Sequence, residues 1–346
     1  MRVKNKLKPM LQSPLIGVLT SILIVFMSNY YLQLSQNSWS FRLATKFAFS
    51  WHTEKFLLGT LVLLMFNLFI VALCGSFLAG NLFYGIGMTL LGIANAMKMS
   101  YRMEPIYPDD LKMIVEWNML RDILGWGLFL VFIILVMGII LLFGYAFYRS
   151  LKLPSFWQKI RIVTLLVTAM FLYYAGQFNQ PNNLLKKAYD RTALWIPYSQ
   201  KMNYYNVGFM GGFLFNLNVE GMTQPDGYSK AAVEEIMSKY DKKAEAANQA
   251  KGEEEQPNVV YIMSESFSDP MRLDGIEFNA DPLKDYRDVA SQGLYSGQML
   301  SQNYGGGTAN IEFEALTGFS MELLNPQMTT PYTMMVSKEA SFPSLV

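Results

Sequence analysis

Long stretches of the chain contain no charged residue, and they constrain the fold more than any other feature. Among them are residues 56–97, 123–148 and 162–185. Because the hydrocarbon core of a bilayer is about 30 Å thick, roughly 20 apolar helical residues cross it. The composition agrees with such crossings, since 52% of the residues are hydrophobic and only 16% are charged. The chain is therefore predicted to be a membrane protein rather than a soluble domain.

The apolar stretches predict five membrane-spanning helices. A first apolar run lies at 15–34, and the stretch at 56–97 is about twice the length of one span. Cys74, Gly75 and Ser76 lie near its middle, where a tight turn would join two antiparallel helices. The predicted spans are, in order, 15–34, 56–74, 77–97, 123–145 and 162–178. We expect the first to remain as an anchor, because its apolar run is longer than the core of a signal peptide.

Basic residues near the span ends predict the orientation. The segment before the first span and the segment between the fourth and fifth spans are both basic and contain no acidic residue. Lysine and arginine are enriched on the cytoplasmic side of membrane proteins, so both segments are predicted to be cytoplasmic. Five spans then place the chain after about residue 179 outside the cell. The predicted localisation is a multi-pass protein of the cell membrane with an extracellular C-terminal domain.

Transport is disfavoured as the task of these helices. Ion and proton pathways usually require ionisable side chains inside the membrane, and the five predicted spans contain none. The polar exceptions Asn67 and Asn81 are predicted to form hydrogen bonds between helices. The only cysteine, Cys74, excludes an intrachain disulfide. The helices are therefore predicted to anchor the chain.

Composition divides the chain into three parts. Residues 1–178 form the predicted transmembrane domain, 179–255 a polar connector with a juxtamembrane segment and a helix, and 256–346 an outer domain. In the connector, helix-forming residues begin at Lys230, and Ser229 is predicted to cap that helix.

The outer domain begins with a predicted strand and an acidic residue. Residues 259–263 are apolar and β-branched, as is typical of a strand buried on both faces. Ligands of open α/β sheets bind beyond the carboxyl ends of such strands. Glu265 follows this strand and is a candidate metal ligand. The alternative, an ordinary exposed charge at a strand end, stays open.

The segment SQNYGGGTANIEFEALTG, residues 301–318, places Thr308 between three glycines and a predicted helix that ends at Gly318. Residues 293–302 before it predict a second strand. Thr308 is predicted to be the N-cap of the helix, which is one explanation for a threonine there. The other is that its hydroxyl, beside unpaired amide groups, acts as a nucleophile where a phosphate binds. A P-loop is excluded, because no lysine follows the glycines.

The motifs NVVYIMSESFSD and GGGTANIEFEALTG, behind five predicted spans and the connector sequence YNVGFMGGFLFNL, resemble the lipoteichoic acid synthase family of the alkaline phosphatase and sulfatase superfamily. The resemblance implies an extracellular α/β sulfatase-like domain that transfers glycerol phosphate from phosphatidylglycerol to polyglycerol phosphate or a glycolipid acceptor. It implies that Thr308 is the nucleophile and a metal neighbour, and that Glu265 is a ligand of Mn²⁺ or Mg²⁺. It implies a structural or orienting role for Glu312. No nucleic-acid partner is expected.

The chain departs from this family in its histidines. The family completes its metal site with an Asp-His pair and adds a substrate-binding His, whereas this chain has one histidine, His52. His52 lies in the predicted first outer loop, matches no motif and is expected to be solvated. The sequence is therefore interpreted as the N-terminal part of a longer enzyme, with an incomplete catalytic domain at 256–346. We expect the 346-residue chain alone to lack transferase turnover.

Other functions stay open beside this one. Sulfate ester hydrolysis is disfavoured, because Thr308 does not lie in a C-x-P-x-R context. Phosphoglycerol transfer to periplasmic glucans, or phosphoethanolamine transfer to lipids, would use a similar threonine and metal. A non-catalytic membrane protein whose outer remnant binds lipid or polymer is the remaining alternative. The sequence leaves the lipid donor, the acceptor and the oligomeric state undetermined.

Overall fold

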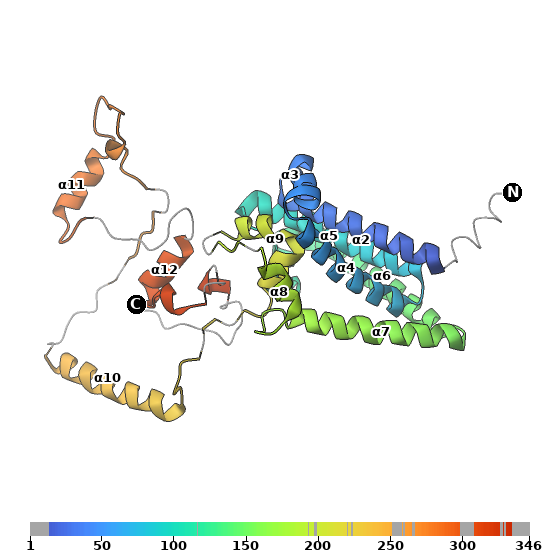
Figure 1. Ribbon diagram of the computed structural model, residues 1–346. Helices are drawn as coiled ribbons and strands as arrows, with labels where there is room; N and C mark the ends of the chain where they lie inside the picture. Colours follow the sequence, from blue (N-terminus) through green and yellow to red (C-terminus); the bar gives the residue numbers. More distant parts are fainter. Residues whose placement is uncertain are drawn as a thin grey trace. The chain divides into compact units, whose positions relative to one another are not determined.

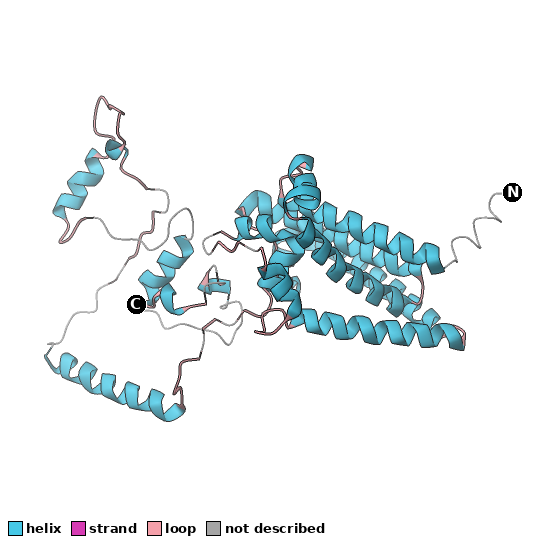
Figure 2. Cartoon of the chain, in the orientation of Figure 1, coloured by secondary structure: helices cyan, strands magenta, loops and turns pink. Residues whose placement is uncertain are grey.

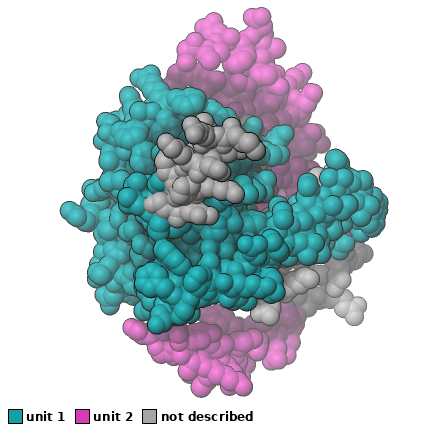
Figure 3. All heavy atoms as spheres, turned by 90° about the vertical axis from the view of Figure 1, so that its right-hand side faces the viewer, with its two compact units in different colours: residues 1–220, 326–329 teal, residues 221–325, 330–346 magenta. Residues whose placement is uncertain are grey.

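The computed structural model describes residues 14–115, 117–192, 194–196, 199–219, 221–222, 224–250, 258, 260–264, 267–297, 308–325, 328 and 330–333. Within these residues the secondary structure is helical and contains no strand (Figure 2). The chain divides into two compact units, one of residues 1–220 and 326–329 and one of residues 221–325 and 330–346 (Figure 3). The basic residues before the first span, which support the predicted orientation, lie outside the described residues.

Five long helices form the body of the first unit and lie side by side (Figure 1). They are α2 (Pro14–Gln36), α4 (Thr53–Cys74), α5 (Phe77–Arg102), α6 (Trp117–Ser150) and α7 (Ser155–Gly176). Each is long and apolar enough to cross a membrane. Helix α4 packs against α2, α5 and α7, so it is the central element of the bundle. The predicted fold class, with five spans in the N-terminal part, is confirmed.

The turn between α4 and α5 has the predicted position. Gly75 adopts a φ of 62°, in the left-handed region that a side chain disfavours. The hydroxyl of Ser76 accepts a hydrogen bond of 3.4 Å from the Ala79 N–H and caps α5. The charge-free stretch therefore folds as two antiparallel helices.

Helix α7 begins earlier than the predicted fifth span, at Ser155 rather than at residue 162. The sequence placed the span after Arg161 because a charged residue is costly in a membrane helix. The Arg161 guanidinium is buried and donates hydrogen bonds to the carbonyls of Ala72, at 2.6 Å, and Leu73, at 3.4 Å. These are carbonyls at the end of α4, which have no partner in their own helix. Because Arg161 donates hydrogen bonds to these carbonyls, its charge is tolerated inside α7.

Buried polar side chains join three of the spans. The Asn67 amide on α4 donates a hydrogen bond of 2.8 Å to Oδ1 of Asn81 on α5, and the Ser21 hydroxyl on α2 donates to the same oxygen at 3.0 Å. All three side chains are buried. Hydrogen bonds of this kind hold membrane helices together, so the predicted role of the two asparagines is confirmed.

The first part of the connector packs onto the end of the bundle where α7 finishes (Figure 1). Helices α8 (Leu184–Asp190) and α9 (Gln200–Phe215) lie there with α3 (Phe41–Lys46) and the π-helix η1 (Phe47–Trp51). The Phe178 ring is central to a buried aromatic cluster, with its centroid 4.9 Å from Phe215 and 5.7 Å from Tyr189. The residues up to 219 therefore belong to the helical unit.

The prediction that His52 is a solvated loop residue is wrong. His52 is half-buried at the junction of η1 and α4, with its ring 5.3 Å from the Phe47 ring. Burial lowers the pKa of the imidazole, and the charge of Lys55 lowers it further. The reason is that residues 41–51, within the predicted loop between the first two spans, are helical, and the Phe47 ring lies against the histidine.

The second unit consists of separate helices and short turns. The helices are α10 (Lys230–Ala250), α11 (Lys284–Gln292) and α12 (Thr308–Thr317), and the 3-10 turns are η3 (Pro270–Arg272), η4 (Met321–Leu323) and η5 (Pro331–Thr333). The Ser229 hydroxyl accepts a hydrogen bond of 3.2 Å from the Ala232 N–H, so the predicted cap of α10 is confirmed.

The two predicted strands, at 259–263 and 293–302, are not strands in the described residues 260–263 and 293–297. A strand needs a hydrogen-bonding neighbour and a surface that buries its apolar side chains. Ile262 and Leu294 instead expose 87% and 96% of their surface. The described part of residues 256–346 therefore contains no sheet.

One arginine closes the loop between η3 and α11. Arg287 donates hydrogen bonds to Asp281, at 2.6 Å, and to Asp269, at 2.9 Å. The hydrogen bond from Arg287 holds the pKa of Asp281 below its ordinary value. Because the folded pKa is the lower one, this contribution to stability is present above the unfolded pKa of about 3.9. It is lost as the pH falls through the folded pKa.

We expect Arg287→Gln to open this loop at neutral pH. Chymotrypsin should then cut the chain faster at Phe278, which lies inside the loop, and the Asp281 carboxyl should titrate nearer its ordinary pKa in an NMR titration. Arg272→Gln, on η3, is the matched control. Equal cleavage rates for both variants and the unchanged protein would contradict this role of Arg287.

Candidate active site around Thr308

Thr308 is the first residue of α12. Gly318 follows the end of the helix with a φ of 72°, and its N–H donates a 2.8 Å hydrogen bond to the Glu314 carbonyl, so the predicted end is confirmed. The prediction that Thr308 precedes the helix as its N-cap differs by one residue. Assignments of helix ends vary by that much. In both assignments the hydroxyl lies at the N-terminus of α12.

Contacts with the following segment hold α12 in place. Phe313 is 1% exposed, and its ring lies 6.2 Å from the Tyr332 ring in an edge-to-face arrangement. Glu314 accepts a hydrogen bond of 2.8 Å from the Met321 N–H. The helix is therefore fastened at its middle and near its end, which fixes the position of its first turn.

Glu312 lies one turn after Thr308, on the same side of the helix. Its carboxylate accepts a hydrogen bond of 3.0 Å from the Tyr332 hydroxyl. Burial raises the pKa of Tyr332, and the hydrogen bond to Glu312 raises it further, so the phenol stays protonated as a donor. This contact fits an orienting role for Glu312. Tyr332 was not singled out in the sequence, where no motif marks it.

The first turn of α12 can present a nucleophile to an anion. The first amide groups of a helix have no partner within it, and the helix dipole favours negative charge at that end. Thr308 is partly buried and lies at this end of the helix. A phosphate bound there would lie within reach of the hydroxyl. The same geometry also suits a threonine that only begins a helix.

The described residues alone do not form a metal site. Among them, no group of three or more His, Cys, Asp or Glu side chains comes together as a metal ion requires. Glu265, the predicted ligand, lies outside the described residues. The carboxylate of Glu312 is already engaged by Tyr332.

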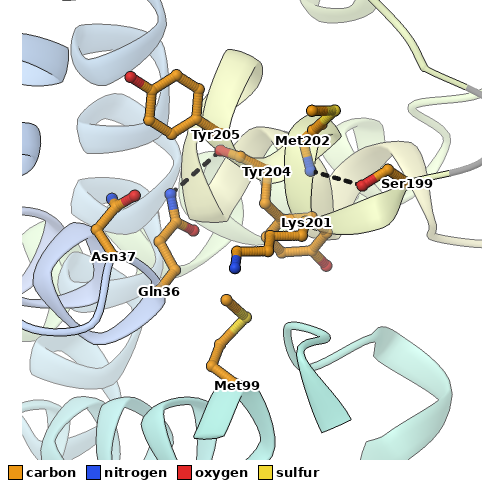
Figure 4. Close-up of a pocket in the computed structure, with 8 residues that line it drawn as sticks. All are labelled: Gln36, Asn37, Met99, Ser199, Lys201, Met202, Tyr204 and Tyr205. Carbon is orange, nitrogen blue, oxygen red and sulfur yellow. Dashed lines mark hydrogen bonds between the residues drawn. The ribbon is translucent and has the colours of Figure 1, made fainter. Parts of the chain in front are cut away.

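A pocket of about 380 Å³ lies in the first unit, between the end of α2, the end of α5 and the beginning of α9 (Figure 4). No motif singled out in the sequence predicts this pocket. The sequence feature that could have indicated the pocket is a group of polar residues at the end of an apolar span, Gln33, Gln36 and Asn37, together with Lys201 in the connector.

One family model matches part of the chain. Residues 257–346 match the family model described as Sulfatase, and both Glu265 and Thr308 lie in this segment. The chain thus combines five candidate membrane spans with a sulfatase-type segment of the alkaline phosphatase and sulfatase superfamily.

The chain is also similar to a curated protein. The chain is 29% identical over 248 residues to a protein of Rhizobium meliloti (strain 1021). The name of that protein describes it as a candidate cyclic beta-1,2-glucan modification protein. The match covers 68% of this chain and 36% of that protein, so it spans about a third of the relative. No solved structure matches the chain.

Proposed function

We propose that the protein is a membrane-anchored transferase of the sulfatase superfamily that moves a phosphoglycerol group from phosphatidylglycerol to a polymer outside the cytoplasm. The observation that carries the proposal is the position of Thr308. It provides a hydroxyl at the N-terminus of α12, inside the segment that matches the sulfatase family model. Helix N-termini bind phosphate groups, and an adjacent hydroxyl can act as nucleophile.

The proposed reaction has two steps. In the first, Oγ of Thr308 forms a bond to the phosphorus of phosphatidylglycerol, the bond to diacylglycerol breaks, and the threonine proton ends on the diacylglycerol oxygen. In the second, a hydroxyl of the acceptor displaces Thr308 and its proton returns to the threonine. The first-turn amides of α12 bind the phosphoryl oxygens. Glu312, held by Tyr332, orients the turn that carries Thr308.

A divalent cation, Mn²⁺ or Mg²⁺, is part of the proposal through Glu265 and Thr308. Such an ion would lower the pKa of the hydroxyl and neutralise phosphoryl charge. We expect EDTA to reduce the release of diacylglycerol from phosphatidylglycerol by roughly tenfold or more, and added Mn²⁺ or Mg²⁺ to restore it. The assay uses protein purified from its native membranes. Unchanged release in EDTA would remove the metal from the proposal.

The name of the Rhizobium relative favours a second acceptor. It concerns a cyclic beta-1,2-glucan, so a glucan hydroxyl is an alternative to the polyglycerol phosphate or glycolipid acceptor that the lipoteichoic acid synthase resemblance implies. Phosphatidylglycerol labelled in its head group distinguishes them. Label in a supplied glucan supports the glucan version, and label in a glycolipid supports the other. Diacylglycerol release without labelled acceptor would indicate hydrolysis. No release from any phospholipid would favour a non-catalytic binding protein.

A further inference from the structure

The pocket between α2, α5 and α9 lies at the level where a membrane would end. Gln36 is the last residue of α2, and Met99 lies in the last turn of α5. Trp39 and Tyr101, at the same helix ends, are exposed, as is usual where rings meet the head-group region. All the residues that line the pocket belong to the first unit.

Gln36 brings an unused hydrogen-bond acceptor to this pocket. Its side chain is 4% exposed. The amide nitrogen donates to Oε1 of Gln33 at 2.7 Å and to the backbone carbonyl of Tyr204 at 3.1 Å, which uses both of its hydrogens. The backbone carbonyl can only accept, so the orientation of the amide is determined. Its Oε1 is buried and accepts no hydrogen bond from any described residue.

The opposite side of the pocket carries a positive charge. Lys201, in the first turn of α9, is exposed and makes no ion pair with a described residue. Figure 4 shows the Gln36 oxygen turned away from the Tyr204 carbonyl, toward the side on which Lys201 lies. Met99, Met202 and the Tyr204 ring complete the wall with apolar, adaptable surface.

The wall of the pocket is rigid behind these groups. The Tyr204 side chain is 1% exposed, and its hydroxyl donates a hydrogen bond of 2.8 Å to the Ile106 carbonyl. Asn95 accepts a hydrogen bond of 2.9 Å from the Ile106 N–H and so fixes the same turn onto α5. A neighbouring cation, Lys98, is paired with Asp110 at 2.5 Å. Among the residues that line the pocket, Lys201 is the cation available to a ligand.

We propose that this pocket binds a phosphoglycerol group, with the phosphate beside Lys201 and a glycerol hydroxyl donating to Oε1 of Gln36. A cation and a buried acceptor together suit an anion that also carries a hydrogen-bond donor such as a hydroxyl. The volume of about 380 Å³ is near the lower end for small-molecule sites, which suits a head group rather than a polymer. The choice of phosphoglycerol among hydroxylated anions rests on the proposed function.

Two sources could supply this group. One is the head group of phosphatidylglycerol in the adjacent leaflet, and the other is a glycerol phosphate unit of a polymer. Binding to the 346-residue chain is measured by native mass spectrometry, with phosphatidylglycerol and phosphatidylserine as lipid probes and glycerol 1-phosphate as soluble probe. Phosphatidylserine is anionic but lacks the glycerol hydroxyls.

We expect the chain to retain phosphatidylglycerol over phosphatidylserine, and Lys201→Gln to weaken binding by roughly tenfold through loss of a charged hydrogen bond. Lys187→Gln, an exposed lysine on α8, is the matched control and should bind as the unchanged chain does. Met202→Trp, which fills the pocket without removing charge, should also weaken binding.

The two sources are distinguished by which probe loses binding when Lys201 is replaced. A lipid source predicts Lys201-dependent retention of phosphatidylglycerol with weak competition by glycerol 1-phosphate, whereas a polymer source predicts Lys201-dependent binding of glycerol 1-phosphate itself. Equal binding of both probes by Lys201→Gln and Lys187→Gln would overturn the proposal. Because the readout is the difference in binding between Lys201→Gln and Lys187→Gln rather than turnover, failure of the transferase proposal and failure of this one are separate results.

Discussion

Replacing Thr308 by alanine is expected to abolish phosphoglycerol transfer. The substitution removes the oxygen that forms the covalent intermediate, and loss of a nucleophile costs several orders of magnitude in rate. We expect a decrease of roughly a thousandfold or more in diacylglycerol release by protein from native membranes. Folding should persist, because the middle of α12 is held by Phe313 and Tyr332 rather than by Thr308.

Two control variants distinguish a nucleophilic Thr308 from a threonine that only begins the helix. Thr308→Ser keeps the hydroxyl and should retain part of the transfer. Thr317→Ala removes a hydroxyl from the other end of the same helix, where this hydroxyl donates a hydrogen bond of 2.6 Å to the Phe313 carbonyl. This variant should leave transfer intact. Transfer that survives in Thr308→Ala at the unchanged rate would contradict the proposed mechanism.

Replacing Gly80 by alanine is expected to destabilise the helical unit strongly. A Cβ added at Gly80 on α5 would lie 2.4 Å from the Val71 Cα and 2.9 Å from the Val71 nitrogen on α4. These are backbone atoms, so the two helices would have to separate. Overpacking of this kind costs about 1–3 kcal/mol. The neighbouring hydrogen bonds from Ser21 and Asn67 to Asn81 would be strained as well.

Gly85→Ala on the same helix is the matched control. An added Cβ there meets nothing within 4 Å, so stability should be unchanged or higher by less than about 1 kcal/mol. The only cysteine, Cys74, is buried beside the same hairpin and provides the readout. A thiol-reactive dye should label it at a lower temperature in Gly80→Ala. Equal melting curves for both variants would show that the close approach at Gly80 is not required.

The helical unit could be predicted well because its signals are local. Charge-free stretches identify the spans, and Gly75 with Ser76 identifies the turn. Two of the less apolar residues in the third predicted span have a structural reason, since Gly80 permits close packing and Asn81 joins three helices. Low hydropathy at these positions reflects contact between helices.

The features that the sequence did not predict depend on contacts between distant residues. Arg161 lies inside α7 because it reaches carbonyls of α4, and the pocket combines the ends of α2 and α5 with α9. No local pattern contains such pairs. The predicted strands were wrong in the described residues for a related reason, since a β-branched run becomes a strand only with a partner strand.

The candidate site was predicted in part. The helix that begins at Thr308 and ends before Gly318 follows from capping preferences and is present. The contact between Glu312 and Tyr332 could not be predicted, because no spacing rule relates residues in separate turns. The pairing of Glu265 with Thr308 stays a prediction, since Glu265 lies outside the described residues.

The central claim is that Thr308 carries the phosphoglycerol group between donor and acceptor. The most direct test incubates the protein from native membranes with phosphatidylglycerol without acceptor, and then maps modified peptides by mass spectrometry. We expect a phosphoglycerol adduct on Thr308, absent from Thr308→Ala. An adduct on another residue, or acceptor labelling without any adduct on Thr308, would contradict it.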